Sequence, residues 1–346
     1  MSVIQKRKKS HIEIALKQTV TNLRKTTGFE DVELEYCALP ELNADRIDTA
    51  TKFLSKRISA PIMIDAITGG IEEGTKINKK IAAVAEAEQI PFSLGSQRAM
   101  IENRKLKDTY YVRDVAPSIP IIGNIGAVQL KEPGMVRRIG EALKDIDADA
   151  LAIHLNPLQE VVQPEGDKNF VGCLAAIGEA CDTLDVPVIV KEVGAGISGE
   201  VARKLDAAGV DMINIAGAGG TSWSRLELLR GDGRLMGFAD GGIPTVCALI
   251  DARAVTKLPL IVSGGVRSGV DVAKGIALGA DYGAAALPFL QAFANKKLEN
   301  TVKLWKDEFR IAMFLAGAAN LNQLKKTRVF VVGKTGEYLN AWRKAR

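Results

Sequence analysis

A short glycine-containing segment near the end of the chain has the composition of a phosphate-binding loop. Residues 263–269 read SGGVRSG and follow the apolar run 259–262. Two adjacent glycines lack a Cβ, so backbone N–H groups there can approach an anion closely. Ser268 and Asp271 form an S-x-x-D capping pattern for a helix predicted over residues 270–277, whose N-terminus would direct free N–H groups at the loop. Alone, the pattern is equally typical of a plain turn between a strand and a helix.

Polar residues also recur where other apolar runs stop. They are Thr68, Ser96, Gln97, Arg98, Asn124, His154, Asn156, Lys191 and Thr221. A single residue of this kind is usually a helix cap or a rim contact. The whole set favours one shared polar site, because the carboxyl ends of parallel strands meet at the same end of a sheet or barrel.

Several of these side chains could take part in metal binding or catalysis. The chain has two histidines, and His154 ends an apolar run that is followed by Gln159 and Glu160. Glu160 can bind Mg²⁺, which prefers one or two carboxylates together with substrate phosphates; further ligands would be phosphate oxygens and water. Lys191 also ends an apolar run, where it could form a Schiff base or stabilise negative charge on a cofactor. His11 follows a basic stretch that is either a solvated tail or a clamp for a diphosphate.

The elements that must position these residues are eight β-rich runs spaced by roughly 30 residues, with helical patterns between them. We predict strands at 61–67, 91–95, 120–124, 150–155, 186–192, 211–216, 259–263 and 282–287. Almost uninterrupted apolar runs are expected for parallel strands that are buried on both faces. Eight βα units predict an α/β protein with a single (β/α)₈ barrel; an open doubly wound sheet is the alternative.

The chain length allows one large barrel, and no linker divides it. We predict a single domain over 1–346, with an N-terminal extension over 1–60 that closes over the site, a barrel over 61–290 and a C-terminal helical segment over 291–346. The segment 217–244 is too long for an ordinary loop and is expected to form part of the site wall. Its two glycines before Thr221 would add a second phosphate cradle.

Composition excludes several other classes of protein. The hydrophobic share of 47% supports a full core, and the four cysteines show no C-x-x-C spacing, which predicts free thiols in a reducing compartment. A net charge of +5 suits anionic small molecules, whereas nucleic acid would require a denser basic stripe. Apolar runs are too short to span a membrane, and the N-terminus lacks the apolar core of a secretory signal. We therefore expect a cytoplasmic protein with no nucleic-acid or membrane partner.

Eight motifs in order give the chain a specific resemblance. They are RK-x-x-H at 7–11, ITGG at 67–70, SQR at 96–98, GNIGA at 123–127, HLNPLQE at 154–160, KEVGAG at 191–196, AGAGGTSW at 216–223 and SGGVRSGVDVAK at 263–274. The sequence resembles the type 2 isopentenyl-diphosphate delta-isomerases, which are FMN-dependent (β/α)₈ enzymes. SGGVRSG is shared with many FMN barrels, but HLNPLQE together with RK-x-x-H is specific to this family.

The resemblance implies reversible interconversion of isopentenyl and dimethylallyl diphosphate in isoprenoid biosynthesis, with reduced FMN, Mg²⁺ and no net redox change. NAD(P)H is the expected reductant, and a homo-oligomer (tetramer or octamer) is expected. The residues expected to bind FMN are Ala66, Ile67, Thr68, Ser96, Asn124, Lys191, Thr221, Gly264, Gly265, Val266, Arg267, Ala286 and Leu287. The residues expected to bind the substrate are Arg7, Lys8, His11, Ser96, Gln97, Arg98, His154, Asn156 and Gln159, with Glu160 on the metal.

Gln159, Lys191 and His154 are the expected catalytic residues. Lys191 would stabilise an anionic reduced flavin, and Gln159 would face the isoprenoid carbons. The chain departs from the family at Gly241, where relatives often carry a tryptophan, at a position expected to lie on a loop or subunit surface.

Other functions would explain only part of this pattern. Another FMN barrel, such as a 2-hydroxy-acid oxidase, would use a histidine base late in the barrel, and no histidine follows His154. An IMP-dehydrogenase-like enzyme needs a cysteine after the sixth strand, and residues 217–223 have none. A Schiff-base aldolase leaves the double cradle and Glu160 unexplained, and a flavin-binding scaffold leaves the whole polar set unexplained.

Overall fold

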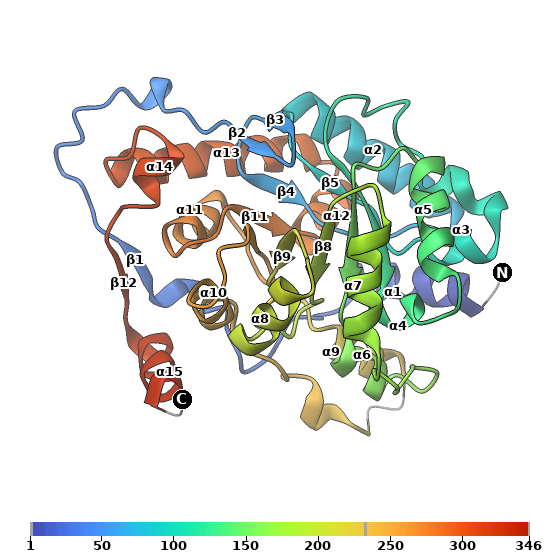
Figure 1. Cartoon of the computed structure of the whole chain (residues 1–346). Helices are drawn as coiled ribbons and strands as arrows, with labels where there is room; N and C mark the ends of the chain where they lie inside the picture. The colour runs from blue at the N-terminus through green and yellow to red at the C-terminus, as the bar shows by residue number, and fades with distance from the viewer. Residues whose placement is uncertain (1–2, 232–233, 345–346) are drawn as a thin grey trace.

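Eight parallel strands close into a barrel in the computed structural model, which describes residues 3–231 and 234–344. The strands are β4 (Ile62–Ile64), β5 (Phe92–Ser93), β6 (Ile121–Gly126), β7 (Ala150–His154), β8 (Val188–Lys191), β9 (Met212–Asn214), β10 (Leu260–Val262) and β11 (Tyr282–Ala285). They pair in chain order, and β11 returns to β4 (Figure 1). The predicted (β/α)₈ fold is confirmed, and each predicted strand overlaps one barrel strand, although β6 runs two residues past the predicted end at Asn124. Residues 1–2 and 345–346 of the predicted terminal segments, and 232–233 of the predicted long loop, lie outside the described residues.

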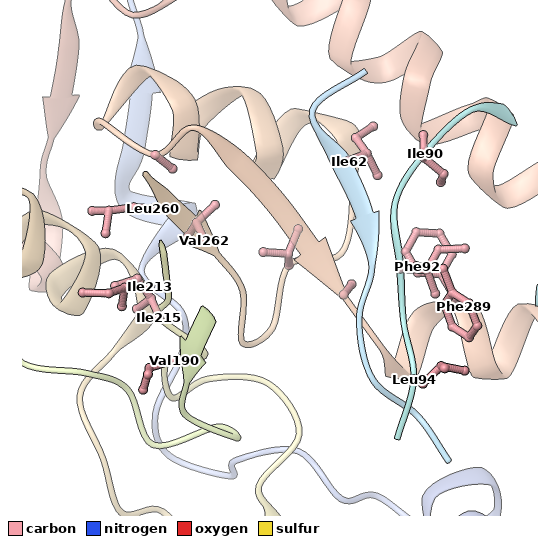
Figure 2. Packing of buried hydrophobic residues seen from close by; sticks show 14 of the residues in the cluster. Ile62, Ile90, Phe92, Leu94, Val190, Ile213, Ile215, Leu260, Val262 and Phe289 are labelled. Carbon is pink, nitrogen blue, oxygen red and sulfur yellow. The ribbon is translucent and has the colours of Figure 1, made fainter. Parts of the chain in front are cut away.

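Strand residues alternate between two hydrophobic layers, as the period of two in a strand requires. One layer fills the barrel interior with Met63, Ile122, Ala152, Ile189, Met212, Ile261 and Ala284. The other lies between the strands and the surrounding helices and includes Ile62, Phe92, Val190, Ile213, Leu260 and Val262 (Figure 2). Burial on both faces explains why the strands read as apolar runs.

Helices follow the strands and form the outer ring. In chain order they are α2 (Glu72–Glu88), α3 (Arg98–Glu102), α4 (Ala127–Leu130), α5 (Met135–Asp145), α6 (Pro157–Val162), α7 (Cys173–Thr183), α8 (Gly199–Ala207), α9 (Trp223–Arg230), α10 (Thr245–Arg253), α11 (Gly269–Ala277) and α12 (Leu287–Ala294). The predicted cap is present, because the Ser268 hydroxyl accepts a hydrogen bond from the Asp271 N–H at 3.1 Å. The long segment between β9 and β10 is not an open loop, since it contains α9 and a short 3₁₀ turn, η4 (Met236–Phe238).

A hairpin from the N-terminal extension lies against the N-terminal end of the barrel. Its strands are β2 (Thr51–Phe53) and β3 (Lys56–Ile58). Phe53 is fully buried in the interior layer and contacts the ring of Tyr282 edge-on, with 4.8 Å between centroids. Because this end is filled, a ligand has to enter at the carboxyl ends of the strands.

A segment of the N-terminal extension and a segment of the C-terminal region pair in a second small sheet. Strand β1 (Val32–Leu34) pairs antiparallel with β12 (Val329–Val331), at the left of the barrel in Figure 1. The segment 291–346, predicted as helical, therefore contains a strand besides α13 (Leu298–Leu315), α14 (Leu321–Leu324) and α15 (Gly333–Lys344). A strand of three residues is stabilised by its partner and gives little signal of its own.

Helix α1 (Val3–Lys17) contacts α9 and α12, both of which follow strands at the carboxyl end of the barrel. It thus covers the open end that the hairpin does not occupy. Within the described residues, no helix is long and apolar enough to cross a membrane.

Candidate active site

A cavity of about 240 Å³ lies at the carboxyl ends of the barrel strands, under α1. It is lined by every residue expected to bind cofactor, substrate or metal except Gln97. Gln97 is fully buried behind the wall, where its amide donates to the Gly95 carbonyl at 2.8 Å and accepts from the Asn124 N–H. Its position makes Gln97 a support for two site loops, because its polar atoms are already paired within the protein.

Strand register brings the polar ends of three neighbouring strands to one level. His154 at the end of β7 is the Cα partner of Lys191 at the end of β8, and Lys191 is the partner of Asn214 at the end of β9. Residues that are in register on parallel strands point to the same face. The barrel therefore presents these three side chains together at the top of its interior.

Lys191 is buried and held by a polar network that crosses the barrel. Its ammonium lies 3.4 Å from Asp65 Oδ2 and donates to the Glu192 carbonyl at 2.9 Å. Asp65 Oδ2 also accepts from the Asn214 amide at 3.0 Å, and the Asn214 oxygen accepts from the Ser263 hydroxyl at 2.5 Å. A lysine paired in this way is held in a fixed position, which suits electrostatic stabilisation of a cofactor better than nucleophilic attack.

His154 is neutral in the ligand-free site. Burial, followed by the positive charges of Lys191, Lys8 and Arg7, lowers the pKa of His154 from 6.5 to about 3. Its Nδ1 lies 2.8 Å from the side-chain oxygen of Asn124. The site thus gathers several cations, which predicts a strongly anionic ligand.

Two glycine loops pack directly on each other and leave backbone N–H groups close to the cavity. A Cβ on Gly220 would lie 2.2 Å from the Gly265 nitrogen, and a Cβ on Gly265 would lie 2.8 Å from the Gly220 nitrogen. Gly264 and Gly265 have φ of +90° and +79°, which disfavours any other residue. Both loops contribute to the cavity lining, through Thr221 on one side and residues 263–267 on the other.

The donor set fits FMN, the cofactor expected from the resemblance. The double cradle is shaped for a phosphate, and the Oγ1 of Thr68 is buried against the cavity without a hydrogen-bond partner in the part of the chain that the structure describes. This hydroxyl is therefore available to hydrogen-bond a bound group. Lys191 and Asn124 provide further polar contacts for an isoalloxazine ring in the same cavity.

Helix α1 adds Arg7, Lys8 and His11 to the cavity wall. His11 Nε2 lies 2.9 Å from Oε1 of Glu227, on α9, and its ring meets Trp223 edge-on with 5.2 Å between centroids. The predicted alternative of a solvated basic tail does not apply to these three residues, because each is at least partly buried.

Glu227 is a functional candidate that sequence reasoning missed. It is 1% exposed, and its Oε1 also accepts from the Gln159 amide at 3.1 Å. Its Oε2 accepts from Arg230 Nε at 2.7 Å. Burial alone would raise the pKa of Glu227, but the bonds from His11, Gln159 and Arg230 outweigh it and lower the pKa to about 2. The available signal was an acidic residue within the long segment 217–244, one turn after Trp223.

Gln163 bridges Glu227 to α1. With its amide oriented to satisfy both neighbours, its nitrogen donates to Glu227 Oε1 at 2.9 Å and its oxygen accepts from Arg7 at 2.8 Å. Gln163 is 1% exposed, so this bridge is shielded from water. Arg7, Gln163 and Glu227 thus form one connected set from the helix to the barrel.

Glu160 and its neighbours form the polar corner at the start of α6. The Asn156 amide donates to Glu160 Oε1 at 2.9 Å and to Gln159 Oε1 at 3.3 Å, while Glu160 Oε2 accepts from the Asp167 N–H at 2.7 Å. No group of three or more His, Cys, Asp or Glu side chains suited to a metal occurs within residues 3–231 and 234–344. A cation at Glu160 would need ligands from the substrate, as Mg²⁺ commonly does.

The remaining wall of the cavity is apolar. It is formed by Ile12, Ala15, Trp223, Leu226, Leu287 and Leu290. These residues come from α1, α9 and α12, the three helices that pack together over the barrel mouth. The cavity thus combines a cationic side with a hydrophobic side, which suits an anionic ligand that carries a short hydrocarbon chain.

Sequence comparison gives consistent relatives over nearly the full chain. The profile of the FMN-dependent dehydrogenase family matches residues 152–331. An isopentenyl-diphosphate delta-isomerase of Pyrococcus furiosus is 45% identical, over 96% of this chain and 88% of that protein. Enzymes of the same name from Methanothermobacter thermautotrophicus (44%; 98% and 96% covered) and Methanosarcina barkeri (46%; 98% and 95% covered) are equally similar.

Solved structures with the same fold are more distant. A (putative) lactate oxidase of Pediococcus acidilactici superposes with a TM-score of 0.70 at 17% identity, covering 94% of each chain. A mandelate oxidase superposes with a TM-score of 0.68 at 18% identity, covering 93% of this chain and 96% of that one. At such identity these matches establish the shared barrel fold alone.

Proposed function

The chain belongs to the isopentenyl-diphosphate delta-isomerase family, within the broader FMN-dependent dehydrogenases, and we propose that it interconverts isopentenyl and dimethylallyl diphosphate. The observation that carries this proposal is the division of one cavity into two sides. Arg7, Lys8 and Arg98 supply the positive charge that a diphosphate requires, with His154 beside them, and the apolar wall from α1, α9 and α12 suits a five-carbon chain.

The residues divide naturally between cofactor and substrate. The double glycine cradle, Thr68, Asn124 and Lys191 hold FMN, which when bound and reduced supplies a group that can exchange protons with the substrate. Lys191 stabilises negative charge on the reduced ring, and the ion pair with Asp65 keeps its ammonium in place. Glu160 binds Mg²⁺ together with diphosphate oxygens, and NAD(P)H reduces the flavin.

Gln159 and Glu227 are the protein groups best placed to assist proton transfer. Moving a double bond requires one proton to be added and another to be removed. The Gln159 amide is fixed between Asn156 on one side and Glu227 on the other, so its position over the cavity is defined. Glu227 is ionised and surrounded by donors, and through His11 it is also connected to the helix that covers the site.

The proposal includes an oligomeric state and a cellular location. The protein acts in the cytoplasm as a homo-oligomer, either a tetramer or an octamer. Helix α1, which lies over the mouth of the barrel, would exclude water from the reacting carbons during turnover.

The rival function is oxidation of a 2-hydroxy acid, since lactate and mandelate oxidases share the fold. The test is a comparison of two substrate classes with the FMN-loaded protein. We expect conversion of isopentenyl diphosphate in the presence of dithionite-reduced flavin and Mg²⁺, and no hydrogen peroxide from lactate or mandelate in air. Peroxide formation from a 2-hydroxy acid, without conversion of the diphosphate, would establish the rival instead.

A further inference from the structure

Lys8 extends from α1 into a closed set of protein oxygen atoms. Its Nζ donates to the Gly69 carbonyl at 2.6 Å, the Ser96 carbonyl at 2.9 Å and the Tyr110 hydroxyl at 2.8 Å. An ammonium carries three N–H donors, so these contacts use its full capacity. Lys8 is therefore engaged with the barrel itself, although it lies at the edge of the cationic side of the cavity.

Tyr110 is the side chain that completes this set. It is fully buried, and its hydroxyl donates to the Ser96 carbonyl at 2.7 Å while accepting from Lys8. The Lys8 ammonium also lies 5.3 Å from the Tyr110 ring centroid, within reach of a cation–π contact. Burial raises the pKa of Tyr110 far above its usual value, so the phenol stays neutral and available to both partners.

The glycines of the ITGG motif make room for this tyrosine. A Cβ on Gly69 would lie 2.1 Å from Cε1 of Tyr110, and a Cβ on Gly70 would lie 2.7 Å from the Tyr110 hydroxyl. Gly70 also has φ of +78°. The motif thus has a steric requirement that comes from Tyr110 and that binding of a phosphate does not explain.

We propose that Tyr110, Gly69 and Gly70 form a socket for the Lys8 ammonium, and that insertion of Lys8 latches α1 across the mouth of the barrel. Arg7 and His11 lie on the same helix, one residue before and three residues after Lys8. Latching places Arg7 on Gln163 and His11 on Glu227. Tyr110 is a positioning residue, which acts on the ligand through Lys8 and the helix.

Insertion of Lys8 into the socket is coupled to binding of an anionic ligand. Burial and the neighbouring Arg7 lower the pKa of Lys8 to about 7, and the charge of Glu102 offsets this only in part. A charged ammonium in the socket is therefore costly in the free protein. Negative charge bound beside Arg7, Arg98 and His154 offsets that cost, so ligand binding and latching favour each other.

Hydrogen exchange of the full-length protein tests the latch without reference to catalysis. The variants are Lys8→Met, which removes the ammonium, and Tyr110→Phe, which removes only the hydroxyl. The matched control is Lys9→Met, because Lys9 is on the same helix but makes an exposed ion pair with Glu73 at 3.5 Å. Without ligand, we expect amide exchange in residues 3–17 to rise about tenfold or more in Lys8→Met, the loss expected for a hydrogen-bonded charge, and less in Tyr110→Phe.

Inorganic pyrophosphate provides the second arm. We expect it to slow exchange of α1 in the unmodified protein and in Lys9→Met, and to bind about tenfold more weakly to Lys8→Met. Unchanged α1 exchange in Lys8→Met would overturn the latch, even with weaker pyrophosphate binding, because Lys8 would then be a direct ligand only.

A kinetic test of the latch rests on the proposed function. In Tyr110→Phe, KM for isopentenyl diphosphate should rise several-fold while kcat at saturation stays within about twofold. A lower kcat with unchanged KM would contradict a positioning role. If the unmodified protein did not isomerise the substrate but α1 exchange still responded to Lys8→Met, the proposed function would fail and the latch would stand.

Discussion

His154 Nδ1 lies 2.8 Å from the side-chain oxygen of Asn124, and this contact determines which ring nitrogen carries the proton. An amide oxygen can only accept, so Nδ1 must donate, and in a neutral ring Nε2 is then an acceptor. A diphosphate offers only acceptors to Nε2. We therefore predict that His154 gains a proton when a diphosphate binds at Nε2.

This requirement gives a pH-dependent prediction. In the free protein the pKa of His154 is about 3, lowered first by burial and then by nearby cations, so the ring is neutral from pH 5 to 8. Since the unfolded chain binds a proton below about pH 6.5 and the native chain does not until about pH 3, His154 reduces stability progressively as the pH falls through this range. Diphosphate adds negative charge and raises the pKa.

Nitrogen-15 NMR of histidine-labelled protein can follow this directly, because the chain has two histidines. We expect no titration of His154 between pH 5 and 8 in the free protein and an imidazolium signal after addition of pyrophosphate. A His154 that titrates near 6.5 without ligand, or that stays neutral in the complex, would refute the assignment.

Replacing Glu227 with glutamine tests the carboxylate behind Gln159. Glu227→Gln keeps the size of the side chain but removes the charge that His11, Gln159 and Arg230 all contact. We expect kcat to fall by about 10²-fold or more, as for loss of a group that assists proton transfer. Steady-state kinetics with reduced flavin measure this.

The matched control is Glu165→Gln. Glu165 pairs with the other end of Arg230, at 2.5 Å, and has a side chain that is 37% exposed. Its loss leaves His11 and Gln159 in place, so kcat should remain within about twofold, as for other partly exposed pairs. Equal losses of kcat in both variants would mean that turnover depends on Arg230 and not on the carboxylate of Glu227.

Replacing Lys191 with alanine tests the cation that would stabilise the reduced cofactor. Lys191→Ala removes the ammonium and leaves Asp65 buried without its ion pair. Loss of one preorganised electrostatic contact in a dry site typically costs about 10²- to 10³-fold in kcat. We expect a loss of that size, together with a lower flavin reduction potential because the reduced ring is no longer stabilised.

Lys204→Ala is the reference variant, since Lys204 lies on the surface and pairs with Glu200 one turn away. It should match the unmodified protein in both kcat and flavin potential. Near-normal turnover in Lys191→Ala would exclude the role given to this residue.

The glycine cradle gives a prediction about cofactor retention. A methyl group in Gly265→Ala would lie 2.4 Å from Thr27 Cγ2, in a backbone conformation with φ of +79°. We expect the loop to shift and the purified protein to lose most of its FMN on gel filtration. Gly237→Ala is the control, because a Cβ there has no neighbour within 4 Å among residues 3–231 and 234–344, and it should retain FMN in full.

The barrel was predictable from the sequence because each strand is buried on both faces and each helix follows at a regular distance. The apolar run before His154, for example, gives both the strand β7 and the position of its polar end. The glycine cradle was predictable for a similar reason: its residues are neighbours in sequence, and the cap at Ser268 is local.

The partners of the site residues were not predictable in the same way. His11 and Glu227 are 216 positions apart, and Asp65 and Asn214 are 149 apart. Tyr110 lies between the SQR motif and β6, in a segment where no motif was recognised, yet it contacts α1. Gln97 was assigned to the ligand because it stands between Ser96 and Arg98, but its side chain supports the wall. Side-chain direction at such positions depends on tertiary packing.

The most direct measurement is analysis of products formed from isopentenyl diphosphate under strictly anaerobic conditions, with Mg²⁺ and with FMN either oxidised or reduced. We expect dimethylallyl diphosphate only with reduced flavin, and a flavin spectrum that is still reduced after many turnovers, since isomerisation has no net redox change. Absence of dimethylallyl diphosphate with bound, reduced FMN, or oxidation of the flavin in proportion to product, would contradict the account.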